Sequence, residues 1–525
     1  MRRSQLRPIV VLSLAWILVL PAGCGNPSQN SSPKMIESPK GPVTTAPAVS
    51  VPSASKLFAD WKDPIGALLI SGQQNNYLEP CGCTQGQFGG IGRRFDLIRK
   101  TEAQGLPIAK IDLGSLIKNP AAARGGMEDS KLRFGIALKA LESMKYDALA
   151  LSADDLRLGV VETLSVYLNL KDRPRVVAGN VAPNEAFAAV IHSSVIAQAG
   201  DLAIGVTSVL APEAYAEVLD ADKDLLTVKS PLESVRPILA ELEKTSKIQV
   251  LLVQGPEALA RELAAALPGF DIVVSTSQVD DPEDKPTLLN DGKTRLIHVG
   301  MKGKYVGVFG FFGDDSIRYQ RVRLDEIRYK NAEPMRKLIE EELQAQFRMR
   351  GIVEDFPRRG NSEGAPGARY VGAETCKECH PATYAKWTNT GHSHAYESIT
   401  KPGRDRRFDA ECVTCHTTGF TYTSGWVSAE ATPYLKGNQC ENCHGPASKH
   451  VEAPDDKSFR ERMHRTAELA DKQGLCIRCH DGDNSPKFDF ATYYGKIAHK
   501  GMDDYRDPKV HKGIVLPPPV ATQSK

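Results

Sequence analysis

Short apolar runs alternate with longer segments of helical spacing between about residues 66 and 324. Apolar side chains recur every three or four positions between these runs, for example at Phe134, Leu138 and Leu141. Such alternation predicts an α/β layered sandwich, with strands feeding helices that cover the sheet. The predicted strands are 67–70, 108–113, 148–151, 175–177, 202–209, 248–253, 272–274 and 305–311.

A last helix of this region is predicted at 333–347, with Pro334 in its first turn, and a polar stretch rich in Gly and Pro follows it. Because a chain of 525 residues is too long for one hydrophobic core, we expect several domains. We predict a signal peptide at 1–24, a flexible tether at 25–58, an α/β domain at 59–352, a linker at 353–369, a mainly α-helical domain at 370–512 and a disordered tail at 513–525.

The first 24 residues have the organisation of an export signal. Basic residues including Arg2 and Arg3 precede an apolar run at 9–20, which is too short to span a bilayer. The segment ends in Pro21-Ala22-Gly23-Cys24 and resembles a lipoprotein signal, in which Cys24 is lipidated, although Pro21 stands where that family prefers Leu. An ordinary cleaved signal is the alternative. Both predict export to the periplasm or cell envelope, and the first predicts a membrane-anchored lipoprotein.

The cysteines are the most informative residues about function. The chain has 11 of them, and eight form four Cys-x-x-Cys pairs, each followed at once by histidine. Two thiols on one helical turn can bond the two vinyl groups of a haem, while the adjoining imidazole ligates its iron. Zinc sites and redox dithiols do not require a histidine after every pair. The spacing therefore predicts four haem c groups, attached through Cys376, Cys379, Cys412, Cys415, Cys440, Cys443, Cys476 and Cys479, with iron ligands His380, His416, His444 and His480.

The formal net charge of the chain is only +2, with 25% charged residues, so no strong electrostatic field favours nucleic acid as a partner. We expect redox proteins as partners instead. A low-spin electron carrier needs a sixth ligand at each iron, and the helical region has six further histidines for that purpose. They are His392, His394, His450, His464, His499 and His511.

Residues 370–512 resemble the tetrahaem cytochrome c-554 family. The resemblance rests on Tyr370-Val-Gly-Ala-Glu-Thr-Cys376, on Trp387 with Thr390-Gly-His392-Ser-His394, on the Gly-Pro segment ending in His450, and on the residues between His480 and His499. It implies that His392, His450 and His499 are distal ligands and that the second haem, on Cys412 and Cys415, is five-coordinate. His394 in place of His392, and His464 or His511 at the second haem, remain alternatives.

The α/β domain resembles the metallophosphoesterases of the 5′-nucleotidase kind, through its first strand, Gly89-Gly90-Ile91-Gly92-Arg93-Arg94 and the order of later strands. That family builds a two-metal site from Asp, Asn and His residues. Amides and hydroxyls stand at the corresponding positions here, and they bind cations too weakly for two-metal hydrolysis. We therefore expect a scaffold with a degenerate metal site. Those positions are Ser71-Gly72-Gln73-Gln74, Gly114-Ser115, Ala153-Asp154-Asp155, Gln254-Gly255 and Ser275-Thr-Ser-Gln278.

A Cys81-Gly82-Cys83 pair lies in the loop before the glycines. Nearby Arg93 and Arg94 favour thiolates, so the pair is a candidate redox couple or soft-metal ligand set, with a structural disulfide as the alternative. The resulting prediction is an exported electron-transfer protein. The alternatives are a haem enzyme acting on a small nitrogen or oxygen species at an open second haem and, third, an active phosphoesterase.

Overall fold

The computed structural model describes residues 58, 60–80, 86–218, 220–361, 365–503 and 516–518. The described residues form one compact unit. We refer to residues 58–352 as the α/β region and to residues 365–503 as the motif region. Cys24, Cys81, Cys83 and His511 lie outside the described residues, as do the predicted signal peptide and nearly all of the tether and tail.

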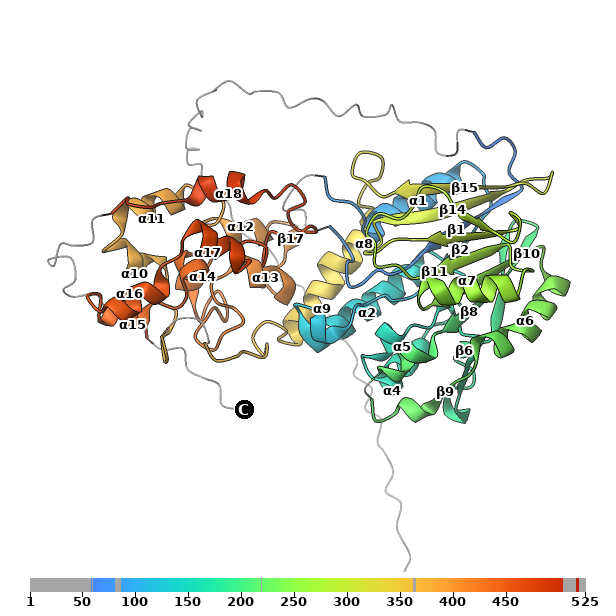
Figure 1. Cartoon of the computed structure of the whole chain (residues 1–525), viewed down its shortest axis with the longest axis horizontal. Helices are drawn as coiled ribbons and strands as arrows, with labels where there is room; N and C mark the ends of the chain where they lie inside the picture. Colours follow the sequence, from blue (N-terminus) through green and yellow to red (C-terminus); the bar gives the residue numbers. More distant parts are fainter. Residues whose placement is uncertain are drawn as a thin grey trace, which may run out of the picture. The chain divides into compact units, whose positions relative to one another are not determined.

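A seven-stranded sheet forms the first layer of the α/β region (Figure 1). Its central strands are parallel, and β14 and β15 add an antiparallel edge beside β1. The apolar run at 66–71 is buried on both faces, as expected for a strand inside a layered domain. In spatial order the strands are β15 (Ile317–Arg323), β14 (Tyr305–Phe311), β1 (Gly66–Ser71), β2 (Ile108–Asp112), β3 (Ala148–Ala150), β4 (Arg175–Val177) and β6 (Ile191–His192).

A six-stranded sheet forms the second layer. It too is parallel at its centre, where β8, β10, β11 and β13 pair in register, and antiparallel at its edges. Its order is β12 (Thr287–Leu289), β13 (Thr294–His298), β11 (Ile272–Ser275), β10 (Ile248–Gln254), β8 (Leu202–Leu210) and β7 (Ser194–Ala199). Strands β5 (Val181–Pro183) and β9 (Leu226–Val228) form a separate antiparallel ribbon, in which β5 contacts β6 of the first sheet.

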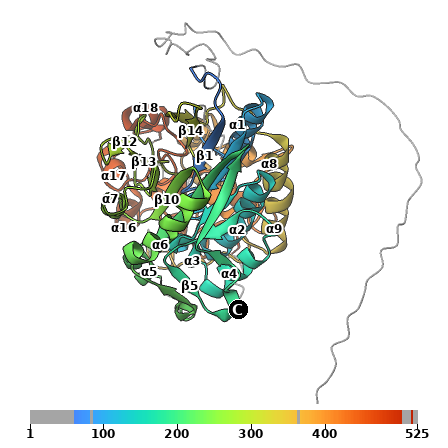
Figure 2. The ribbon, with the colours of Figure 1, turned by 90° about the vertical axis from the view of Figure 1, so that its right-hand side faces the viewer.

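The two sheets pack face to face between two helical layers. Leu68 and Ile70 of β1 share an apolar core with Val250 and Leu252 of β10. Helices α1 (Ile91–Ala103) and α2 (Gly126–Ser143) cover the outer face of the first sheet, and α6 (Pro231–Thr245) and α7 (Glu257–Ala266) cover that of the second. Figure 2 shows α6 and α2 on opposite sides of this sandwich. The predicted fold class and all eight predicted strands are confirmed.

The last helix of the α/β region is longer and less regular than predicted. It runs through α8 (Glu333–Lys337), a π-helical segment (Leu338–Leu343) and α9 (Gln344–Met349). Buried Met335, Ile339, Leu343 and Phe347 all face the same core. The i, i+4 spacing of these side chains keeps one face apolar through the wider turn.

Short helices and turns make up most of the motif region. Trp426 is buried against Tyr396 and Phe420, whose ring centroids lie 5.9 and 6.2 Å from its own. The helices are α10 (Ala373–Lys377), α11 (Pro381–Thr388), α12 (Ala395–Ile399), α13 (Ala410–His416), α14 (Cys440–His444), α15 (Ser448–Glu452), α16 (Lys457–Met463), α17 (Ala467–Lys472) and α18 (Phe490–Ile497). A mainly helical second region is thus confirmed.

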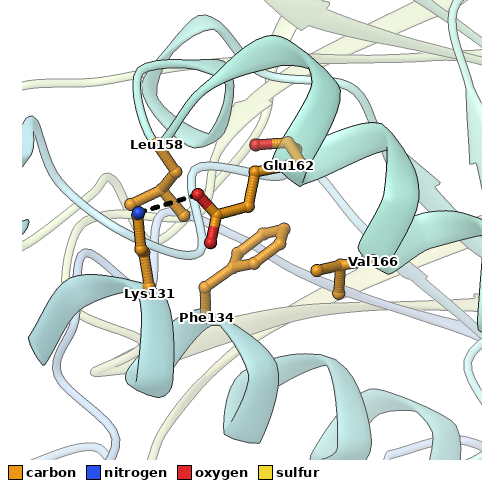
Figure 3. Close-up of a pocket in the computed structure, with 6 residues that line it drawn as sticks. Lys131, Phe134, Leu158, Glu162 and Val166 are labelled. Carbon is orange, nitrogen blue, oxygen red and sulfur yellow. Dashed lines mark ion pairs between the residues drawn. The ribbon is translucent and has the colours of Figure 1, made fainter. Parts of the chain in front are cut away.

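A small hollow lies between α2 and α4 (Val160–Leu168) in the α/β region (Figure 3). Lys131 and Glu162 form an ion pair of 2.8 Å at its rim, above the ring of Phe134. None of its lining residues belongs to the four cysteine motifs. Across the described part of the chain, no helix is both long and apolar enough to cross a bilayer.

Candidate metal centres

The cysteine motifs lie in helices or hydrogen-bonded turns. The second motif ends α13, the third forms α14, the first begins in α10, and the fourth lies in a turn outside the helices. In the first and fourth motifs the backbone N–H of the histidine donates to the backbone carbonyl of the first cysteine, at 2.9 Å for His380 and 2.8 Å for His480. A turn of this kind places both thiols and the imidazole on one side of the backbone, as covalent haem attachment requires.

Three histidines outside the motifs lie opposite three motif histidines. His450, His392 and His499 face His380, His480 and His444, at ring-centroid distances of 6.5, 6.0 and 5.7 Å respectively. These three are the distal candidates taken from the sequence, and the structure brings each of them to a different motif.

The spacing of the three pairs matches two imidazoles on one metal ion. An imidazole nitrogen binds such an ion at about 2 Å and the ring centroid lies about 1 Å further, so two opposed rings have centroids about 6 Å apart. Tilted aromatic rings in direct contact have centroids about 4.5 to 7 Å apart, a range that includes the same values. The three distances are therefore compatible with one iron between each two rings, and they are also compatible with direct ring contact.

Backbone carbonyls orient several of these imidazoles. The Nδ1 atom of His444 donates to the Met463 carbonyl at 2.6 Å, and that of His499 donates to the Ile497 carbonyl at 2.9 Å. A carbonyl can only accept, so the proton stays on Nδ1 and the Nε2 lone pair is available to a metal. Burial lowers the pKa of His444 to about 4, which keeps the ring in the neutral, ligating form at neutral pH.

His416 of the second motif is oriented in the same way. Its Nδ1 atom donates to the Ala395 carbonyl at 2.6 Å and lies 3.0 Å from the Ser398 hydroxyl. His392, His450 and His499 are all placed at other motifs. The two alternative ligands within the described residues, His394 and His464, are solvent-exposed, and 70% of the His394 side chain is accessible.

Thiols of different motifs lie next to one another. The Cys440 side chain raises the pKa of the Cys376 thiol, and the Cys479 side chain raises that of Cys415, so these sulfurs of different motifs are close enough to interact. Groups bonded to these sulfurs would lie side by side in two pairs. The third and fourth motifs are close as well, because Cys443 and Cys476 interact electrostatically.

Glu441, inside the third motif, joins that motif to the start of the region. Its buried carboxylate accepts from the backbone N–H groups of Val371, Gly372 and Ala447, at 2.8 to 3.0 Å. Gly372 has a φ of 82°, and an added Cβ would lie 2.8 Å from the Tyr434 carbonyl, so only glycine fits there. The sequence reasoning missed Glu441, because a variable position inside a motif carries no signal of burial.

The polar side chains at the carboxyl ends of β1, β2 and β10 bond to one another and to backbone. The Gln73 amide makes two hydrogen bonds to the backbone of Ser277, at 2.8 and 2.9 Å. The Ser115 hydroxyl donates to Gln254, whose amide in turn donates to the Leu113 carbonyl. Among the described residues no group of three or more His, Cys, Asp or Glu side chains could hold a metal ion.

A buried arginine occupies the same edge of the first sheet. Arg94 lies 3.4 Å from Asp112 and donates to Ser71 at 3.1 Å, and Ser71 donates to Asp112 at 2.5 Å. Tyr146 completes the cluster, with its hydroxyl 2.9 Å from that of Ser71. Burial raises the pKa of Asp112, and the guanidinium beside it opposes that shift. The sequence analysis named Arg94 only as a neighbour of the cysteine pair, which lies outside the described residues; its bonds to Ser71 and Asp112 were not predicted.

Four Cys-x-x-Cys-His turns, three of them with an opposed imidazole, define the class of c-type cytochromes. More specifically, residues 375–445 match the family described as cytochrome c554 and c-prime, so the C-terminal region contains a cytochrome c554 domain. Over 123 residues the chain is 29% identical to cytochrome c-554 of Nitrosomonas europaea. The alignment covers 21% of this chain and 48% of the relative, so the chain spans about half the length of that protein.

Comparison with solved structures gives matches for both regions. A 5′-nucleotidase precursor from Thermus thermophilus matches 62% of this chain and 68% of its own, with 15% identity and a TM-score of 0.44. A calcineurin-like phosphoesterase from Bacillus subtilis matches 54% of this chain and 97% of its own, with 17% identity and a TM-score of 0.41. Reduced cytochrome c554 from Nitrosomonas europaea matches 27% of this chain and 96% of its own, with 22% identity and a TM-score of 0.20.

Proposed function

We propose that this protein is an exported tetrahaem c-type cytochrome that transfers electrons. Each of the four motifs would hold one haem c through its two cysteines and its histidine. The observation that carries the proposal is the set of three imidazole pairs, with centroids 5.7 to 6.5 Å apart, each joining a motif histidine to a histidine from elsewhere in the chain. Covalent haem supplies one-electron exchange between ferric and ferrous iron.

The residues of the motif region suit that exchange. Opposed imidazoles would hold an iron in nearly the same geometry in both oxidation states, so little would have to move on electron transfer. Nδ1 hydrogen bonds to carbonyls fix the ring orientation and raise the basicity of Nε2. Such bonds are present at His444 and His499, which form one pair, and at His416 of the second motif.

The thiol contacts suggest the order in which electrons pass. The first and third motifs are adjacent through Cys376 and Cys440, and the second and fourth through Cys415 and Cys479. Proximity of Cys443 to Cys476 links these two pairs. We therefore propose a path in the order first, third, fourth and second motif.

A second candidate function is redox catalysis at the second haem. All three paired distal histidines belong to the other motifs, which favours an iron at His416 that can accept a small nitrogen or oxygen species. An active phosphoesterase ranks below both, because the side chains at the corresponding strand ends are engaged with one another and with backbone.

Export and a lipid anchor at Cys24 belong to the same proposal, as do redox partner proteins. They agree with covalent haem attachment, which requires an exported chain, and with the apolar segment at 9–20. Cys81 and Cys83 are proposed as an accessory redox pair. Their reduction state in the purified protein, measured by thiol alkylation and mass spectrometry, tests that role.

The decisive experiment counts haems on protein matured in a host that assembles c-type cytochromes. Intact mass and the absorbance of the reduced pyridine complex should give four haems per chain. Replacing both cysteines of one motif by serine should remove one haem and leave three. Wild-type protein with fewer than four haems, or with zinc in their place, would contradict the proposal. Electron paramagnetic resonance then tests the second candidate, since catalysis at the second haem requires one high-spin iron that binds nitric oxide, and four low-spin irons would exclude it.

A further inference from the structure

A buried arginine of the α/β region is bonded to the helix that carries the second motif. Arg133 of α2 donates from Nη2 to both carboxylate oxygens of Asp409, at 2.7 and 2.8 Å. Only 9% of the Arg133 side chain and 6% of the Asp409 side chain are accessible. The two residues are 276 positions apart, so this pair joins the two regions of the chain.

The other neighbours of Arg133 fix its guanidinium in place. Its Nε donates to Asp129 at 2.6 Å, one helical turn earlier, and Glu411 lies 3.8 Å from Nη2. The guanidinium carbon also lies 5.3 Å from the centroid of the Phe347 ring. Bonds on two sides and an aromatic face leave the side chain little freedom to move.

Asp409 is the residue at which the second motif's helix begins. Its side chain accepts from the N–H of Glu411 at 3.0 Å and caps α13. Its carbonyl accepts from the N–H groups of Cys412 and Val413, both at 3.0 Å. Holding Asp409 therefore holds the first turn of the helix that presents Cys412, Cys415 and His416.

The charge of Arg133 lies near this motif, because its guanidinium is bonded to Asp409, three residues before Cys412. A group attached at Cys412 would lie close to the same charge. Adding an electron to a haem is easier beside a fixed positive charge, above all where burial weakens screening by solvent.

We infer that Arg133 is a positioning and charge-setting residue of the second haem, through which the α/β region anchors α13 and raises the reduction potential of the iron at His416. The inference rests on the proposed haem at the second motif. It assigns the α/β region a role in electron transfer that needs no metal site of its own.

The test is a potentiometric titration of the holoprotein, followed by haem absorbance. In this titration each haem gives one reduction wave, the step in absorbance at which that haem is reduced. The wave of the second haem is first identified with His416→Met, because methionine ligation raises the potential of the haem that it binds. This assignment does not depend on whether the second iron is open. A protein without haem at the second motif would lack the wave altogether, so failure of the proposed function is seen before the inference is tested.

Arg133→Met should lower the potential of the second wave and leave the first and third haems unchanged, whereas Arg133→Lys should stay close to wild type. Asp409→Asn should raise the same potential, because it removes a negative charge while asparagine still caps α13. The matched control is Lys139→Met, which removes another cation of α2 that pairs with Glu342.

Equal shifts in Arg133→Met and Arg133→Lys, or equal shifts of all four waves, would show a structural role only and overturn the inference. An unchanged second wave in Asp409→Asn would do the same. That variant also decides the question if Arg133→Met protein does not fold.

Discussion

Replacement of His392 by alanine tests the ligand assignment within a single loop. The ring of His392 lies 6.0 Å from that of His480, while His394, two residues later, has 70% of its side chain in solvent. Both histidines belong to the short connection between α11 and α12. His394→Ala is therefore a control of the same size, chemistry and position in the chain.

We expect His392→Ala to change the spin state of one of the four proposed haems. Removal of the imidazole leaves the iron at His480 with five ligands, so the high-spin share of total haem should rise by about one quarter. The backbone carbonyl of His392, which accepts from Asn438 at 3.0 Å, is kept in the variant. Loss of a half-buried side chain costs about 1 kcal/mol in stability, which is too little to unfold the region.

Spin quantitation by electron paramagnetic resonance, together with carbon monoxide binding to the ferrous protein, measures this share. His392→Ala should bind one more equivalent of carbon monoxide than wild type, and added imidazole should restore the low-spin signal. His394→Ala should match wild type in both measurements. A high-spin increase in His394→Ala, or none in His392→Ala, would refute the assignment of the distal ligand.

Three further predictions concern buried groups. Burial raises the pKa of Asp155 from 3.8 to about 7, so the folded state loses up to about 4 kcal/mol relative to the unfolded chain as pH rises from about 4 to about 7. Asp155→Asn should therefore flatten the pH dependence of urea unfolding and gain stability at pH 8. Arg94→Met should cost about 3–5 kcal/mol by leaving Asp112 unpaired, with partial recovery in the double variant with Asp112→Asn. Glu441→Gln should lower Tm, at a cost of about 1–3 kcal/mol, since an amide replaces one accepting oxygen.

Each of these predictions has a contrary result. An Asp155→Asn variant with the pH profile of wild type would show that the carboxyl group is not the titrating one. Additive losses in the Arg94 and Asp112 double variant would show that the two side chains stabilise the fold independently. An unchanged Tm in Glu441→Gln would mean that the three backbone donors find other acceptors.

Local patterns in the sequence were sufficient for the strands and the motifs. Strand β10 contains the apolar run 250–253, and each cysteine motif carries its chemistry in five consecutive residues, so neither depends on distant contacts. The pairing order of the strands could not be predicted. Strand β1 lies between β2 and β14, and these pairings are set by packing rather than by neighbouring sequence.

The contacts between distant residues carried no local signal. In the sequence, nothing distinguishes Arg133 and Asp409 from other polar residues. Only the folded chain shows that each is buried against the other. The same holds for Arg94, which reads as one of two basic residues after a glycine turn but reaches Asp112 inside the sheet edge. Buried pairs of this kind require the three-dimensional arrangement, since sequence spacing reports only on neighbours along a helix or strand.

The position of β1 in the sheet has a consequence for the order of assembly. Ile70 pairs with Gly307, so a strand near the beginning of the chain obtains one of its two neighbours only after more than half of the chain has been synthesised. Sheets that depend on such distant partners form slowly. Residues 376–480 come later in the sequence than β14, and α13 contacts α2 through Arg133 and Asp409. Haem attachment after the proposed export would therefore be easiest before this contact forms.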